Sequence, residues 1–278
     1  MAISFFGKLT RVSLMLIVSA VTIVSAQAPI GQISEIVGSI LIKRSADSAW
    51  VKGRIKMPLY DKDAIRTKAE SRCEISLVGS KVVRFGENAL GLISAPSEGE
   101  TTVKSAAGSV WINVKKLSTP SNVNIVSPTS TAAIRGTVFG VDCDTNGTNY
   151  TVFAGAVAVS SKTGKSGTND SGFVVKPGEQ FTLVKDLNLY MKNQEKAMAD
   201  FLKSSQAAYD QFEQQQQGAF DKFEAEQKAK LASMVAAERA AFVSGGDFSY
   251  AKRSFDIEKS PKKAWILWNQ EQDKKLSW

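Results

Sequence analysis

The 278-residue chain has no histidine, two cysteines and seven prolines. Histidine is the most common general base, the usual activator of a serine or cysteine nucleophile, and the most common metal ligand. Its absence argues against hydrolases and metal sites that depend on it. Beyond its first 26 residues the chain also lacks an apolar run long enough to cross a membrane.

Residues 1–26 have the pattern of a secretory signal peptide. Lys8 and Arg11 form a basic start, an apolar run follows, and residues 24–26 (Val-Ser-Ala) form a cleavage signature. The apolar run is shorter than the roughly 20 residues of a spanning helix, which favours a cleaved signal over an uncleaved inner-membrane anchor. We therefore expect a periplasmic or secreted protein with no nucleic-acid partner.

Positive charge is concentrated in the first part of the expected mature chain. Residues 27–185 hold 19 basic and 13 acidic side chains, whereas residues 186–242 hold 7 and 9. Such a surplus suits anionic partners, such as lipid headgroups, phosphorylated polysaccharide or acidic protein, or it serves solubility. We favour solubility.

Residues 27–185 are predicted to form a β domain. Short runs of β-branched and aromatic residues alternate with glycine-containing turns, and Asn146-Gly147 has the composition of a tight hairpin. Strands this numerous and this close predict a barrel, a sandwich or a solenoid. Cys73 and Cys143 lie in such runs, and two alternatives stay open for them: one disulfide, or two buried thiols.

From residue 186 the composition changes to alanine, glutamine, lysine and glutamate. Two apolar residues recur in each unit of eleven residues. Eleven residues in three helical turns correspond to about 3.67 residues per turn, a period that keeps an apolar stripe nearly parallel to the helix axis. The pattern predicts one long helix over residues 186–243, with Gly218 as a locally weak point. The expected interface residues are Tyr190, Phe201, Tyr209, Phe212, Phe220, Phe223 and Met234.

Three arrangements of this helix compete. In order of preference, it packs along the β domain, pairs in a coiled coil that allows self-association, or lies on a membrane surface. Membrane contact comes last because the segment is slightly acidic. Residues 244–278 are expected to be a polar tail with a short helix around 261–275, whose Trp265 and Trp268 either fray with the tail or form an anchor.

Two segments of the β region carry a resemblance. Residues 126–139 (VSPTSTAAIRGTVF) look like the "tP.a.a.vrGT.F" signature of the FecR domain family, and residues 63–67 (DAIRT) are similar to its "gD.irT". The resemblance runs from about Gly31 to Gln180 and implies a non-catalytic domain, solenoid-like or sandwich-like, without a cofactor. The matching signature residues are Arg66, Thr67, Pro128, Arg135, Gly136, Thr137 and Phe139.

In the founding regulators of that family, the domain receives a signal from an outer-membrane transporter and controls a cytoplasmic sigma factor. Those regulators carry a cytoplasmic segment before a spanning helix, whereas ten residues precede Arg11 here. We therefore expect an exported binding or scaffolding module that recognises protein or cell-wall polymer. The alternative is a sensory component that relays an envelope signal through a partner membrane protein.

Catalytic and metal-binding residues are not predicted. Asp61 with Asp63, and Asp142 with Asp144, are close acidic pairs whose spacing in a strand puts both carboxylates on one face, which suits a hard cation such as calcium. Solvated acids beside turns are the favoured interpretation.

The signature arginines also carry two interpretations. Arg66 and Arg135 can bind an anion or a sugar, or they can bond loop carbonyls or the nearby Asp63 carboxylate. We favour the structural role.

Overall fold

The protein is described by a computed structural model that covers residues 27–97, 99–115, 122–134, 136–162, 172–210 and 217–276. The predicted signal peptide, residues 1–26, lies outside these described residues. So do Arg135 of the family signature and Phe212 of the expected helix interface.

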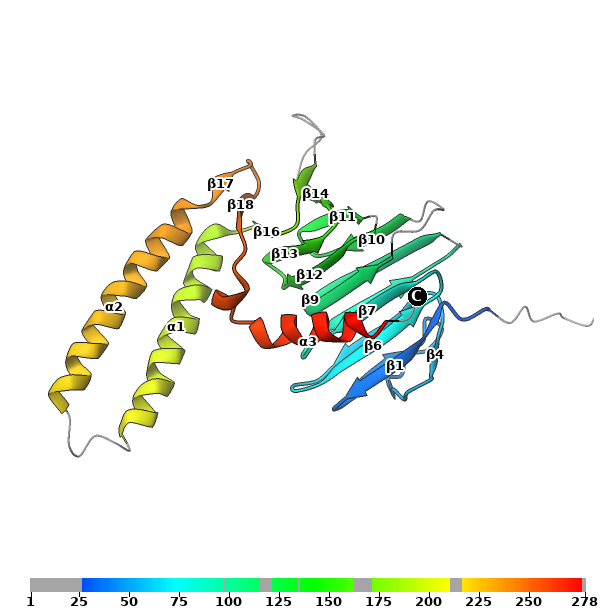
Figure 1. The fold of residues 1–278 in the computed structure, drawn as a ribbon, viewed down its shortest axis with the longest axis horizontal. Helices are drawn as coiled ribbons and strands as arrows, with labels where there is room; N and C mark the ends of the chain where they lie inside the picture. Colours follow the sequence, from blue (N-terminus) through cyan, green and yellow to red (C-terminus); the bar gives the residue numbers. More distant parts are fainter. Residues whose placement is uncertain are drawn as a thin grey trace, which may run out of the picture.

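Within the described residues the chain is mainly β and ends in three α-helices (Figure 1). The helices are α1 (Leu187–Asp210), α2 (Gln217–Ala240) and α3 (Lys263–Lys274), with a short 3₁₀ helix, η2 (Ile257–Lys259). The strands are β1 (Gly31–Val37), β2 (Ile40–Lys43), β3 (Val51–Lys52), β4 (Pro58–Leu59), β5 (Asp63–Thr67), β6 (Arg72–Leu77), β7 (Lys81–Phe85), β8 (Leu90–Ser94), β9 (Glu100–Val114), β10 (Asn122–Val126), β11 (Ser130–Ile134), β12 (Val138–Cys143), β13 (Gly147–Ala154), β14 (Val157–Ser161), β15 (Phe173–Val175), β16 (Glu179–Val184), β17 (Val243–Ser244) and β18 (Ser249–Ser254).

The strands pair in two sheets that share the long strand β9. Sheet A has the order β4-β1-β6-β7-β9-β12-β13-β16-β18-β17. Sheet B has the order β3-β2-β5-β8-β9-β10-β11-β14-β15, and its β9–β10 pair is parallel whereas the other described pairs are antiparallel. The chain crosses between the sheets at Gly108, where φ is +85° and a Cβ atom would lie 2.5 Å from Ala89 Cα. Glycine is required there because both the conformation and the space exclude a side chain.

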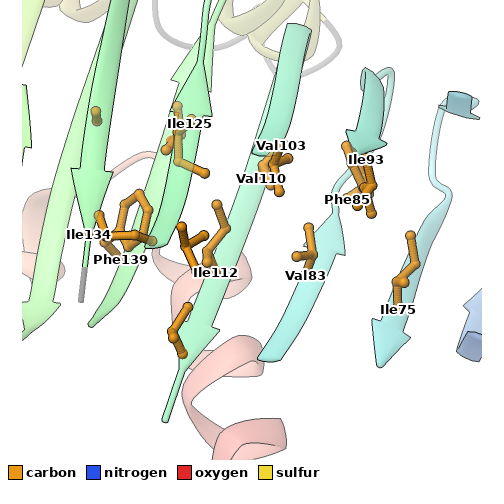
Figure 2. Close-up of a cluster of buried hydrophobic side chains, with 14 of the residues drawn as sticks. Ile75, Val83, Phe85, Ile93, Val103, Val110, Ile112, Ile125, Ile134 and Phe139 are labelled. Carbon is orange, nitrogen blue, oxygen red and sulfur yellow. The ribbon is translucent and has the colours of Figure 1, made fainter. Parts of the chain in front are cut away.

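One hydrophobic core takes alternate side chains from both sheets (Figure 2). Sheet A contributes residues such as Ile75, Val83 and Phe139, and sheet B contributes residues such as Ile93 and Ile125. Each fully buried side chain of this size stabilises the fold by about 1.5–3 kcal/mol relative to an exposed one. The period-two alternation that predicted strands thus also fixes which side chains enter the core.

The two cysteines are buried free thiols, so the disulfide alternative is wrong. Cys73 lies in β6 and Cys143 in β12, with β7 and β9 between them in sheet A. Three strand spacings separate them by roughly 14 Å, twice the reach of a disulfide. Burial raises the pKa of Cys73 to about 12 and raises the pKa of Cys143, whose Sγ donates to Ser105 Oγ at 3.2 Å.

The predicted single long helix is wrong, because the segment forms two helices, α1 and α2. They run antiparallel: Arg239 near the end of α2 donates to Asn188 near the start of α1 at 3.0 Å, and the rings of Tyr190 and Phe242 lie 5.4 Å apart. Gly218, the predicted weak point, lies within α2 near its start. Folding back brings the two narrow apolar stripes together, so that each covers part of the other, which one extended helix cannot do.

This helical hairpin, α1 and α2 together, projects away from the strands (Figure 1). Of the expected interface residues, Tyr190 is half-buried at its base, whereas Phe201, Phe223 and Met234 are exposed by 62%, 40% and 52%. Tyr209 lies in α1 and Phe220 in α2. The segment with the eleven-residue period therefore forms a hairpin, and part of its apolar stripe is exposed on the surface. Contact of those exposed residues with another chain stays a prediction.

The residues after the hairpin return to the β domain, although the sequence pattern indicates a polar tail. Strand β18 pairs with β16 over six residue pairs, from Glu179–Ser254 to Val184–Ser249. Helix α3 then lies across β6, β7 and β9 (Figure 1). The short helix around 261–275 is confirmed, and its tryptophan anchor docks on the protein's own sheet.

Candidate binding groove

The outer face of sheet A carries an unbroken row of cross-strand neighbours over seven strands. The register places one residue from each of these strands side by side, so the row runs across most of the width of the sheet. In order from β6 to β18, the row consists of Glu74, Arg84, Trp111, Gly140, Thr151, Gln180 and Arg253.

Helix α3 covers the first part of this row through buried charge. Arg84, which is fully buried, donates to Glu74 Oε2 at 2.7 Å and to Asp273 Oδ1 at 2.5 Å, and Trp111 donates to Asp273 Oδ2 at 3.0 Å. One carboxylate of α3 thereby satisfies groups from β7 and β9. Because each charge is paired, the helix is held in a defined position on the sheet.

Aromatic and basic side chains fix the rest of α3. Trp265 and Trp268 stack with their ring centroids 5.5 Å apart, and the Arg72 guanidinium lies 4.2 Å from the centre of the Trp268 ring. At the start of the helix, Lys262 donates to Ser109 Oγ at 2.6 Å and forms an ion pair with Asp142. The helix is therefore attached at both ends.

The second part of the row forms the floor of a groove with a volume of about 520 Å³. Its walls are the start of α3, the segment around Phe255, and the base of the helical hairpin. Ligand sites typically enclose about 300–1,000 Å³, so the groove has the size of one. It opens at Gly140, the one residue of the row without a side chain. The other residues that line the groove include Asp142, Asp144, Asn149, Thr151, Phe153, Gln180, Thr182, Tyr190, Gln194, Glu238, Arg253, Phe255, Lys262 and Trp265.

A two-point ion pair attaches the hairpin wall to the sheet. Arg253 of β18 donates to both carboxylate oxygens of Glu238 in α2, at 2.5 and 2.8 Å. Hydrogen bonding to this carboxylate raises the pKa of the Arg253 guanidinium, and burial together with the charge of Glu238 raises the pKa of Tyr190. Near neutral pH the wall therefore presents a neutral phenol beside a neutralised ion pair.

The floor presents amides and hydroxyls from β13 and β16. Thr182 donates to Asn149 Oδ1 at 3.0 Å, and Gln180 donates through Nε2 to Thr151 Oγ1 at 3.3 Å. These bonds hold both amides against the sheet. Each leaves the other end of the amide for a ligand: a donor group on Asn149 and an acceptor oxygen on Gln180.

The described signature residues other than Arg66 stabilise the β domain, and none of them lines the groove. Buried Thr67 donates to Gly86 O at 2.5 Å and accepts from Ala89 N at 2.8 Å, and Phe139 is fully buried in the core. The other described members are buried Thr137, which donates to Ala156 O at 3.3 Å, Gly136 at φ +60°, and half-buried Pro128.

Arg66 does not bond the Asp63 carboxylate, as the structural interpretation expected, and its binding of an anion or a sugar stays a prediction. It is exposed on the outer face of sheet B, and its guanidinium lies 4.4 Å from the centre of the Trp50 ring. Arg44, rather than Arg66, pairs with the buried Asp63 carboxylate. Arg66 is therefore a surface stacking residue on the side of the domain opposite the groove.

The acidic pairs have separate structural partners. Asp61 accepts from Ser94 Oγ at 2.7 Å and from Ala95 N at 2.8 Å. Asp144 accepts from two backbone N–H groups of its hairpin turn, at Asn146 and Gly147, both at 2.7 Å. Across the described part of the chain, no cluster of three or more acidic or cysteine side chains is arranged to hold a metal ion.

The groove was not predicted from the sequence. One local signal was available, because Asn149, Thr151 and Phe153 alternate along β13 and so share one face of the strand. Arg253, Phe255 and Lys262 carried no signal, since they lie in a segment that indicates a polar tail. For Phe255 and Lys262, the contribution depends on contacts across more than 100 residues, with Phe153 and Asp142.

Comparison with known proteins gives a family match over part of the chain. The family model described as FecR protein matches residues 63–158. Two crystal structures of a predicted anti-sigma factor from Parabacteroides distasonis are similar at 14% sequence identity and a TM-score of 0.38, over 44% of this chain. The match spans about half of that protein's length (54%). Curated proteins gave no match. Among the described residues, no helix is long and apolar enough to span a membrane.

Proposed function

We propose that the chain, whose residues 63–158 match the FecR protein family model, is an exported, non-catalytic binding module of the bacterial envelope. The groove on the outer face of sheet A is its recognition surface, and the hairpin and α3 act as the scaffold that shapes this surface. The partner is a protein or a cell-wall polymer. The signal-peptide pattern of residues 1–26 supports export.

The observation that carries the proposal is that three parts of the chain meet to build one groove. The FecR domain supplies Gly140 and Asn149, the hairpin supplies Tyr190 and Glu238, and the segment containing α3 supplies Trp265. Concave sites with convergent polar groups are the usual location of ligand binding. A surface assembled from segments this far apart suits recognition by shape and hydrogen bonding.

The groove's carboxylates support a role in binding rather than catalysis. Asp142 pairs with Lys262, Glu238 with Arg253, and Asp144 with turn N–H groups. A general base or nucleophile needs a positioned proton acceptor or an activated side chain. These three acids are instead engaged in holding the walls and the turn.

Co-sedimentation of the purified mature protein with isolated cell-wall and membrane fractions tests the proposal. Gly140→Trp fills the groove, and the backbone tolerates it because a Cβ atom at this position meets Trp111 at an ordinary 3.8 Å. Ala133→Trp is the matched control, since it adds the same ring to an exposed position of sheet B.

We expect the wild type and Ala133→Trp to sediment with one of the fractions and Gly140→Trp to stay in the supernatant. Equal sedimentation of both variants would show that the groove is not the recognition surface. Failure of all three proteins to sediment would contradict the proposed function.

A further inference from the structure

Aromatic rings line one side of the groove at graded depth. Trp111 is fully buried and stacks on Phe153 with ring centroids 4.7 Å apart, and Phe153 meets Phe255 edge to face at 5.8 Å. Phe153, Phe255 and Trp265 are half-buried. Partly exposed rings on a rigid base offer flat apolar surface, against which the C–H face of a sugar ring packs well.

Hydrogen-bonding groups lie beside Phe153 on β13 and on the neighbouring strand β16. Thr151 separates Asn149 from Phe153 along β13, and Gln180 of β16 lies directly opposite Thr151 in the register. The free donor of Asn149 and the free acceptor of Gln180 are thus close together on the floor. Each hydroxyl of a sugar both donates and accepts, so adjacent hydroxyls match such a pair.

The charge of the groove selects against anionic ligands. Asp142, Asp144 and Glu238 contribute three negative charges, and Arg253 and Lys262 contribute two positive charges, which gives a formal charge of −1. This differs from the whole chain, whose formal net charge is +8. A neutral ligand therefore fits the groove better than a phosphorylated or acidic one.

The backbone of the floor is not available for binding an extended peptide. Strand β13 pairs with β12 and β16, and β16 pairs with β13 and β18. Peptides that add to a sheet need a free strand edge, and the floor has none among these strands. Recognition over β13 and β16 must therefore use side chains.

We infer that the groove binds a neutral oligosaccharide, with sugar rings packed on Phe153, Phe255 and Trp265 and hydroxyls bonded to Asn149 and Gln180. The inference rests on the proposed function and names the chemical class of its ligand. A neutral sugar matches the aromatic surface, the donor and acceptor pair, and the low charge together.

Titration of the full mature chain with two neutral trisaccharides, chitotriose and maltotriose, tests the inference. Saturation-transfer NMR reports contact on the sugar, and the indole N–H signals of Trp111 and Trp265 report it on the protein. We expect at least one sugar to bind and to shift these indole signals. Gly140→Trp should abolish binding, and Ala133→Trp should leave it unchanged.

A second variant separates loss of binding from loss of folding. Asn149→Ala combined with Gln180→Ala removes the two amides, and we expect affinity to fall by about tenfold or more, as the loss of hydrogen bonds to a ligand predicts. Unfolding curves of both variants confirm that the domain remains folded.

Three results would overturn the inference. If neither sugar binds, whereas envelope fractions still retain the wild type and not Gly140→Trp, the ligand class is wrong and the proposed function stands. If a sugar binds equally well to Gly140→Trp and to the amide variant, the sugar site lies elsewhere. Selective binding of a short peptide at the groove would likewise replace the sugar as the ligand.

Discussion

The outer faces of the two sheets follow the same alternation of side chains and have different fates. On sheet A, Arg84 and Trp111 are fully buried beneath α3. On sheet B, Arg66 and Lys104 lie at equivalent outward positions and are exposed. An outward polar residue in a strand pattern therefore need not contact solvent. A later segment of the chain can cover it and supply the partner that offsets the free-energy cost of burying it.

Arg84→Met should give the largest effect in this comparison. It leaves Glu74 and Asp273, with side chains 12% and 14% exposed, as uncompensated carboxylates under α3. Breaking a buried ion pair in this way costs about 3–5 kcal/mol. Urea unfolding should show this loss in the free energy of unfolding, and the comparison fails if the variant is as stable as the wild type.

Trp111→Phe should have an intermediate effect. The change removes the bond from the indole N–H to Asp273 and reduces the stacking on Phe153. Loss of one hydrogen bond to a charged group predicts a destabilisation of about 1.5–3 kcal/mol. Chemical denaturation measures it, and Trp265→Phe serves as a control because it retains the Asp273 bond. Similar losses in both variants would contradict the role given to Asp273.

Glu238→Gln should act locally, at the junction of the hairpin and the sheet. It weakens a half-buried ion pair with Arg253, for which a loss of about 1 kcal/mol or less is expected after solvent screening. Hydrogen exchange should become faster in α2 and remain unchanged in the strands of the core. Faster exchange throughout sheet A would instead show that the hairpin supports the whole fold.

Arg66→Met should give the smallest effect. It is the same substitution as Arg84→Met, made on the exposed outer face of sheet B. Arg66 is exposed and stacks on Trp50, a surface contact worth about 0.5–1 kcal/mol. The loss in the free energy of unfolding should therefore be at least three times smaller for Arg66→Met than for Arg84→Met. Equal losses at the two positions would remove the distinction between the covered and the open face.

Much of the β domain could be predicted from local sequence. The strand around Ile75 and the hairpin at Asn146-Gly147 were recognisable because alternation and turn composition act over a few residues. The FecR signature was equally local, and residues such as Thr67 and Phe139 now have structural roles. The groove was not predictable, because its floor, hairpin wall and α3 wall come from segments far apart in the chain.

The C-terminal region shows where local pattern fails. The eleven-residue period correctly indicated helix, but one helix and a folded pair satisfy the same period, and tertiary packing chose the pair. In α3, Trp265 and Trp268 indicated an anchor, but the inward positions Asn269 and Asp273 are polar, so the pattern did not predict that charged groups are buried beneath the helix. Strand β18 was not predicted either, because its run of strand-forming residues is short and lies within a polar segment.

The sequence alone determined the alternation of the strands, the positions of the turns, the family signature and the helical period, because each depends on neighbouring residues. Tertiary structure decided the shared strand β9, the antiparallel hairpin, the burial of Arg84 and the groove. Arg84 and Asp273 are 189 residues apart. A charge can be buried there only because folding brings its counter-charge to the same place, and no local pattern encodes that meeting.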